Sequence, residues 1–111
     1  MPVQASTPDR IDTLRDTGYE FRPGDPVCVR VVHRDRRTLV TDDGAAIARA
    51  GSPRGWQAVA DRLGAELNVN ISRQGVVSLP VVRVGPPEAE VVRRIGAAAR
   101  AFYQDLLELA E

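Results

Sequence analysis

Apolar and polar positions in the middle of the chain follow the two-residue period of a β-hairpin. Valines on alternate positions predict a strand over residues 27–32. A charged turn at residues 33–36 and a short strand over residues 37–41 complete the predicted hairpin. Because Arg30 falls on the more polar side of the first strand, we expect that face to be partly solvated or Arg30 to pair with an acid.

The next segment changes to a helical pattern. Asp42-Asp43-Gly44 ends the hairpin and opens a short helix that Gly51 closes. Ser52-Pro53 is a typical start for another helix, with a capping hydroxyl and a proline in the first turn. Apolar residues then recur at helical spacing and predict one buried stripe: Trp56, Val59, Ala60 and Leu63.

A second hairpin and a long helix complete the pattern. Residues 67–72 alternate strictly and predict a strand with one wet face, followed by a loop at residues 73–75. Residues 76–84 predict the returning strand, in which Pro80 indicates an edge position or a bulge. From Glu88 to Leu109, apolar residues recur every three or four positions, which predicts a helix of about six turns.

The N-terminal pattern is weaker. We expect residues 1–6 to be disordered and Thr7-Pro8-Asp9 to start a helix that runs to Thr17. Residues 19–22 alternate as a strand does, before a turn rich in proline and glycine. The sequence therefore predicts one α+β domain with four or five mainly antiparallel strands, covered on one face by helices.

Length and composition exclude several classes. With 111 residues, the chain has room for one domain with one core. No apolar run approaches the ~20 residues of a membrane span, and the start lacks the pattern of a signal peptide, so we expect a cytoplasmic protein. Cys28 is the sole cysteine and is predicted to be a buried thiol rather than a nucleophile. Fifteen positive charges, all arginine, balance fifteen acids, which argues against non-specific nucleic-acid binding as the main role.

Two polar clusters could carry chemistry. Asp42 and Asp43, with Asp25 nearby, could hold a divalent metal, but capping of the following helix is the simpler interpretation. A basic cluster at the hairpin could instead bind phosphate, although a solvated turn with local ion pairs is favoured; its members are Arg30, Arg34, Arg36 and Arg37. His33 is the sole histidine and is predicted to be a solvated turn residue. No cofactor motif is present, and an enzyme is not favoured.

The C-terminal helix offers the main candidate for a partner-binding surface. Its apolar residues cover more than a third of its circumference, which fits core packing but leaves room for contact with a second chain. If part of it forms an interface, Phe102, Leu106 and Leu109 are the residues we expect to bind the partner.

The chain resembles an uncharacterised domain family of bacteria and their phages. The resemblance covers about residues 19–109 and rests on Gly24-Asp25, the strand at residues 27–32, the strand-ending Asp42-Asp43-Gly44 and, loosely, residues 54–63. Pro26 departs from the family pattern. The family has no established activity, so the resemblance implies a phage, mobile-element or defence setting and no reaction.

The predicted order of elements also looks like that of secretion-chaperone-like domains, which dimerise and bind extended segments of partner proteins. Element order alone does not establish function. The sequence favours a non-catalytic protein-interaction module, such as an adaptor, a chaperone-like protein or an antitoxin, dimeric and acting through its terminal helix and an exposed sheet edge. The alternatives are a nucleic-acid-associated factor that uses the arginine hairpin and a metal-dependent enzyme that uses the three aspartates.

Overall fold

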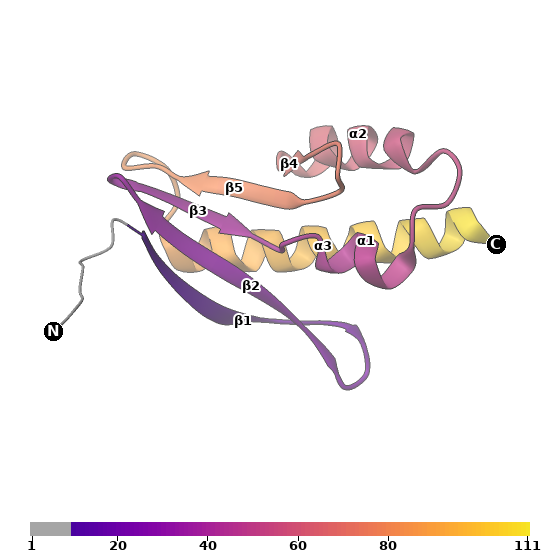
Figure 1. Ribbon diagram of the computed structural model, residues 1–111, viewed down its shortest axis with the longest axis horizontal. Helices are drawn as coiled ribbons and strands as arrows, with labels where there is room; N and C mark the ends of the chain where they lie inside the picture. Colours follow the sequence, from indigo (N-terminus) through magenta and orange to yellow (C-terminus); the bar gives the residue numbers. More distant parts are fainter. Residues whose placement is uncertain (1–9) are drawn as a thin grey trace, which may run out of the picture.

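Alternating and helical segments of the sequence assemble into a sheet and three helices within the described part of the chain. The structure, a computed structural model, describes the backbone of residues 10–111 and the side chains of residues 12–111. The elements, shown in Figure 1, are β1 (Arg10–Arg22), β2 (Asp25–Arg34), β3 (Arg37–Thr41), α1 (Ala45–Ala50), α2 (Trp56–Leu67), β4 (Asn70–Ile71), β5 (Val77–Val81) and α3 (Glu88–Ala110).

The sheet has the strand order β1-β2-β3-β5-β4, and every neighbouring pair is antiparallel. The first three strands form a meander, and β5 joins it beside β3 after the two shorter helices. This arrangement confirms the predicted α+β class, with a five-stranded sheet and a long C-terminal helix.

The core lies between one face of the sheet and α3, which runs along the length of the sheet (Figure 1). The two-residue period of β2 explains this: Val27, Val29 and Val31 are buried, while Cys28 on the other face is exposed. Helix and strands both contribute large side chains that are fully buried: Val27, Val29, Val31, Val40, Val77, Val91, Ile95, Phe102 and Leu106. The opposite sheet face carries none of the helices described here.

The predicted N-terminal helix is wrong from Arg10 onward, because this segment is the strand β1. A helix there would have only Ile11 and Leu14 as sizeable apolar residues, whereas a strand pairs with β2 over a regular register from Arg10 to Asp16. Because the predicted order began with this helix, the order of elements in the structure is less similar to that of secretion-chaperone-like domains than the sequence predicted. The predictions for residues 1–6 and for the helix start at residues 7–9 lie outside the described residues.

The second hairpin is shorter than predicted. Helix α2 continues to Leu67, and Asn68 ends it in the left-handed conformation with φ 55°, so the strand at residues 67–72 shrinks to Asn70–Ile71. Strand β5 ends at Val81. Pro80 pairs with Leu39 of β3, beyond the point where β4 ends, so it occupies a local edge as its missing N–H requires.

Candidate functional site

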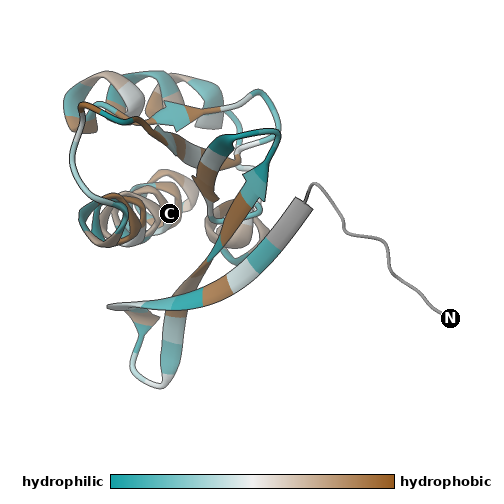
Figure 2. Ribbon diagram, turned by 90° about the vertical axis from the view of Figure 1, so that its left-hand side faces the viewer, coloured by the Kyte–Doolittle hydropathy of each residue, from teal (hydrophilic) through white to brown (hydrophobic). Residues whose placement is uncertain are grey.

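Strand β1 is a long, open edge of the sheet. Within the described residues it pairs with β2 and with no other strand, so along its 13 residues every second backbone N–H and C=O faces away from β2. Leu14 lies on this strand opposite Arg30, and its side chain is 75% exposed. In Figure 2, β1 forms the outer border of the sheet with no described helix beyond it. A large exposed apolar side chain on an unpaired edge is typical of an interaction surface.

A bulge divides β1 and turns its second half onto α3. The register with β2 shifts between Asp16 and Glu20, and Gly18 adopts φ +85°, a conformation that glycine tolerates best. The Thr17 hydroxyl donates to the backbone oxygen of Val27 at 2.7 Å, and the Asp16 carboxylate accepts the Gly18 N–H at 2.8 Å. These bonds fix the bulge, so the edge changes direction at a defined point.

Helix α3 supports the bulged strand through two contacts. Gly96 lies against Thr17 so closely that a Cβ atom on Gly96 would overlap the threonine side chain. Three residues after Gly18, the Phe21 ring packs edge-on against Tyr103, with 5.3 Å between ring centroids. Arg49 of α1 covers the Phe21 ring at 4.5 Å. These contacts fix the position of β1 on α3, although the outer edge of the strand has no neighbouring strand within the described residues.

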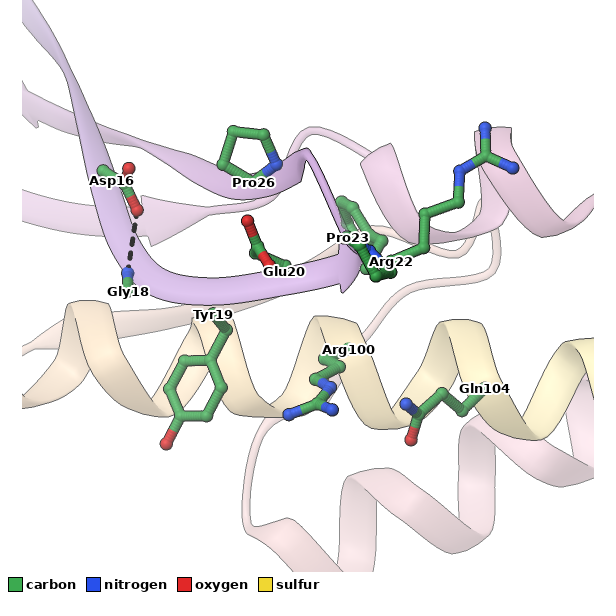
Figure 3. Close-up of a pocket in the computed structure, with 10 residues that line it drawn as sticks. Asp16, Gly18, Tyr19, Glu20, Arg22, Pro23, Pro26, Arg100 and Gln104 are labelled. Atoms are coloured by element: carbon green, nitrogen blue, oxygen red, sulfur yellow. Dashed lines mark hydrogen bonds between the residues drawn. The ribbon is translucent and has the colours of Figure 1, made fainter.

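A surface hollow of about 700 Å³ lies between the second half of β1 and α3. It is lined by Asp16, Gly18, Tyr19, Glu20, Phe21, Arg22, Pro23, Pro26, Arg100 and Gln104. Figure 3 shows Tyr19, Arg100 and Gln104 side by side along the helix below the strand. A segment lying along the β1 edge would therefore meet helix side chains as well as the strand backbone.

Helix periodicity extends this wall along α3. Residues seven and four positions apart share a helix face, so Arg93, Arg100 and Gln104 form one stripe next to the Gly96–Tyr103 line that contacts β1. All three side chains are exposed. Within residues 12–111, Arg93 and Arg100 have no ion pair or hydrogen-bonded partner from their side chains. The sequence did not predict this stripe, because the pattern of a single helix does not reveal where the sheet edge will lie.

Arg30 is committed to two carboxylates, as one of the two sequence interpretations expected. Its Nε and Nη2 donate to Asp43 at 2.9 and 2.7 Å, and its Nη1 donates to Asp12 at 2.6 Å. Hydrogen bonding by Asp43, and then by Asp12, raises the pKa of Arg30 above its ordinary value. Arg30 therefore ties β1 to the end of β3 and is not available to a phosphate.

The other three arginines of the predicted basic cluster lie together at the β2–β3 turn. Asp35 and Arg36 form a two-residue turn with φ 51° and 64°, which places Arg34 and Arg37 opposite one another. All three arginines are exposed. A hollow of about 580 Å³ beside them is lined by Val32, Arg34, Asp35, Arg37 and Leu39. The structure thus groups Arg34, Arg36 and Arg37 but separates them in role from Arg30.

The three aspartates proposed as metal ligands have separate partners. Asp42 is 2% exposed and accepts N–H groups of Gly44 and Val77 at 2.8 and 2.9 Å, with a longer contact of 3.3 Å to Ala46. The contact with Ala46 puts Asp42 at the first turn of α1, while the N-cap position itself is held by Gly44 without a side-chain cap. Burial raises the pKa of Asp42, and its backbone hydrogen bonds oppose that change.

Asp43 binds Arg30, and Asp25 binds Arg49 through two hydrogen bonds of 2.8 and 3.1 Å. The Arg49 hydrogen bonds lower the pKa of Asp25. Among the residues whose side chains are described, no group of three or more histidine, cysteine, aspartate or glutamate side chains could hold a metal ion. The structure therefore does not bring Asp25, Asp42 and Asp43 together.

The C-terminal helix is largely core. Phe102 and Leu106 have no exposed surface within the single chain, and the Phe102 ring lies 6.4 Å from that of Trp56. These two side chains offer nothing for a partner to contact, which corrects their assignment to an interface. Leu109, at 40% exposure, remains at the surface of the last turn.

Two further sequence predictions need correction. Cys28 is exposed on the uncovered sheet face, because it alternates with the buried valines of β2. His33 belongs to β2 and not to the turn: its Nδ1 lies 2.9 Å from the Thr38 hydroxyl, and its Nε2 lies 3.8 Å from Glu88. Cys28 and His33 therefore lie on opposite faces of β2.

Comparison of the chain with protein-family models, with curated proteins and with solved structures finds no match. The resemblance to a bacterial and phage family therefore stays a prediction. Among the helices that the structure describes, none is long and apolar enough to cross a membrane.

Proposed function

We propose that this protein is a non-catalytic protein-interaction module that binds a partner along the β1 edge of its sheet. The observation that carries the proposal is the combination of a 13-residue edge strand and a 75% exposed Leu14 upon it. An extended segment of the partner would add to β1 as a further strand, since backbone hydrogen bonds give such complexes affinity with little demand on sequence.

The position of β1 on α3 supports this mode of binding. Strand addition requires an edge that is already ordered, because ordering a loose strand would cost free energy at the moment of binding. Thr17 against Gly96 and Phe21 against Tyr103 hold β1 in place. Strand addition along such an edge is compatible with the adaptor, chaperone-like and antitoxin roles that the sequence favours.

Self-association through α3 is a separate proposal with a smaller surface than the sequence suggested. Only the exposed side chains of the last turns, Leu107 and Leu109, at 39% and 40% exposure, could contribute. Size-exclusion chromatography with light scattering on the Leu109→Asp variant tests it: loss of a dimer would support an α3 interface, and an unchanged oligomeric state would remove it.

A nucleic-acid-associated role is the second candidate, favoured by the three exposed arginines at the β2–β3 turn. It predicts affinity for nucleic acid that falls steeply with salt and falls further when Arg34, Arg36 and Arg37 are neutralised. Affinity that ignores salt, or that survives neutralisation, would remove this candidate. A metal-dependent enzyme has no comparable support, and we do not propose it.

Affinity capture from the native host, with and without nuclease, tests the leading proposal. Wild-type protein is compared with Leu14→Lys, which puts a charge on the β1 edge, and with Val84→Lys, which changes a 95% exposed valine after β5. The proposal predicts a stoichiometric protein partner that survives nuclease, is lost from Leu14→Lys and is retained by Val84→Lys. Equal capture by both variants, or a partner released by nuclease, would contradict it.

A further inference from the structure

We infer that the β1 edge selects an extended segment with acidic side chains on alternate positions, which pair with Arg93 and Arg100 of α3. This inference rests on the proposed function and adds the chemistry of the partner. Its basis is the juxtaposition of an unpaired strand edge with two exposed cations on the adjacent helix face. Neither cation has a side-chain partner within residues 12–111.

Geometry places the two arginines where alternate side chains of an added strand would point. Gly96 and Tyr103 contact β1, and Arg93 and Arg100 lie next to that line on the side away from the core. Seven helical residues span about 10.5 Å. Same-face residues of a strand lie about 7 Å apart, or about 14 Å at the next repeat, and long arginine side chains cover the difference.

The other side of the added strand would meet a different surface. Leu14, Asp16 and Glu20 are exposed on β1. Leu14 shares the uncovered face with Arg30, which Asp12 and Asp43 already neutralise. Acidic residues near the middle of this face would meet Asp16, so cross-strand repulsion disfavours them there, while the free Arg34 lies only at the far end of the strand pair. The inferred segment therefore alternates acids toward α3 with uncharged residues toward the uncovered face.

The remaining wall of the hollow fits the same occupant. Gln104 continues the Arg93–Arg100 stripe and can donate from its amide to a carboxylate or to the strand backbone. Tyr19 lies beside Arg100 in the same hollow and adds an apolar ring with a hydroxyl (Figure 3). Among the charged residues that line the hollow, Arg22 and Arg100 balance Asp16 and Glu20, so the preference for acidic side chains comes from the unpaired Arg93 and Arg100 of the helix stripe.

Synthetic peptides test the inference with the full chain. Fluorescent peptides of about ten residues, long enough to lie along β1, alternate threonine with glutamate, glutamine or lysine. Fluorescence anisotropy gives their affinities, and amide chemical shifts of labelled protein map where each binds. We expect the glutamate peptide to bind about tenfold more tightly than the glutamine peptide, with shifts along β1, because two exposed ion pairs of ordinary strength give that factor.

Charge reversal on the helix provides the matched comparison. Arg93→Glu and Arg100→Glu should each weaken the glutamate peptide and strengthen the lysine peptide. Arg94→Glu, an exposed neighbour of Arg93 that points to another side of α3, should change neither. Circular dichroism confirms that each variant is folded, which is expected because all three side chains are exposed.

The possible outcomes distinguish a failure of this inference from a failure of the proposed function on which it rests. Equal shifts along β1 with all three peptides, or equal effects of Arg93→Glu and Arg94→Glu, would overturn the acidic preference and leave strand addition standing. Shifts confined to the β2–β3 turn would overturn it in favour of a separate basic site. A dimer in the absence of peptide that Arg100→Glu disrupts would assign the edge to a second copy and overturn it as well.

Discussion

The two edges of the sheet are built in opposite ways. Strand β4 has two residues and lies against α2, so that edge is short and covered. Strand β1 has 13 residues and has a neighbour on one side alone within the described chain. Proteins usually protect long edges by bulges, by charges or by covering elements. Here a bulge at Gly18 and the inward Arg15, paired with Glu88 at 2.9 Å, protect β1 partly and leave Leu14 exposed.

The difference between the two edges indicates which surface of the sheet is available for binding. At the β4 edge, the short strand and the packing of α2 protect the sheet against pairing with other chains. The open edge at β1 is long and ordered, and cations without partners in the described chain lie beside it. An exposed edge that costs solubility is retained most readily when binding uses it.

The largest expected effect comes from removing the support that both edges share. Phe102→Asp buries a charge in the core where α3 contacts sheet and helices, and it should unfold the protein, since an unpaired buried charge costs several kcal/mol or more. Circular dichroism checks it. Leu109→Asp, at a 40% exposed site, should unfold nothing and change stability by about 0.5 kcal/mol or less. A folded Phe102→Asp monomer would instead return α3 to the role of an interface.

A substitution at Gly96 should destabilise the β1 side of the sheet and leave the β5 side unchanged. Gly96→Val pushes against Thr17 and should lift β1 from α3, with a loss of about 1–3 kcal/mol in the free energy of unfolding. Urea denaturation measures that loss, and hydrogen exchange should show faster exchange in β1 than in β5. Ala97→Val, at a partly exposed position beside it, is the control with little change expected. Equal loosening of β1 and β5 would contradict this local role.

The two halves of the sheet should respond to pH in opposite directions. The folded pKa of Asp42 is raised by burial, so its contribution to stability is full below the unfolded value of 3.8 and is lost as pH rises through the folded pKa. Relative to Asp42→Asn, the wild type should therefore lose stability as the pH rises above about 4. Urea denaturation across this range measures the difference.

Asp25, next to the turn of the β1–β2 hairpin, provides the opposite sign. The Arg49 hydrogen bonds lower its pKa, so its contribution is present above the unfolded value of 3.8 and is lost as pH falls through the folded pKa. The difference between wild type and Asp25→Asn should shrink below about pH 4. If the stability of the Asp42→Asn and Asp25→Asn variants changed with pH in the same way, burial of Asp42 and the Arg49 hydrogen bonds of Asp25 would not be the causes of the pH dependence.

The smallest effect is expected on the uncovered face. Arg30→Met removes the link from Asp12 of β1 to Asp43, and it should cost about 0.2–1 kcal/mol, as exposed ion pairs do. Urea midpoints measured at low and high salt should converge, because salt screens the pair. Arg34→Met, on the same face of β2 without a partner in the described chain, is the matched control. A loss that does not depend on salt would show packing to be the cause.

The sequence predicted the elements whose local pattern agreed with their tertiary setting. The hairpin strands, the short helix ending at Gly51 and the long C-terminal helix all follow their expected periods. The N-terminal segment failed because the cap signal at Thr7-Pro8-Asp9 suggested a helix, while pairing with β2 favoured a strand. Tertiary pairing cannot be read from a segment with only two sizeable apolar residues.

In the candidate site, too, the sequence predicted the features that depend on local chemistry and not those that depend on tertiary structure. The sequence offered an acid partner for Arg30 as one of two alternatives, and it placed one of the two adjacent aspartates at the start of α1; both follow from local chemistry. The stripe of Arg93 and Arg100 gains meaning only from the position of β1 beside it, which depends on the sheet order. Burial of Phe102 and Leu106 depends likewise on how much of α3 the sheet covers.

Hydrogen exchange at the two edges tests the central claim most directly. Exchange of backbone amides is measured for the protein alone and in complex with the captured partner, and β1 is compared with β4. The proposal predicts that amides along Arg10–Arg22 slow on binding while those of Asn70–Ile71 do not. Protection at the β2–β3 turn or at β4, with β1 unchanged, would contradict binding at the open edge.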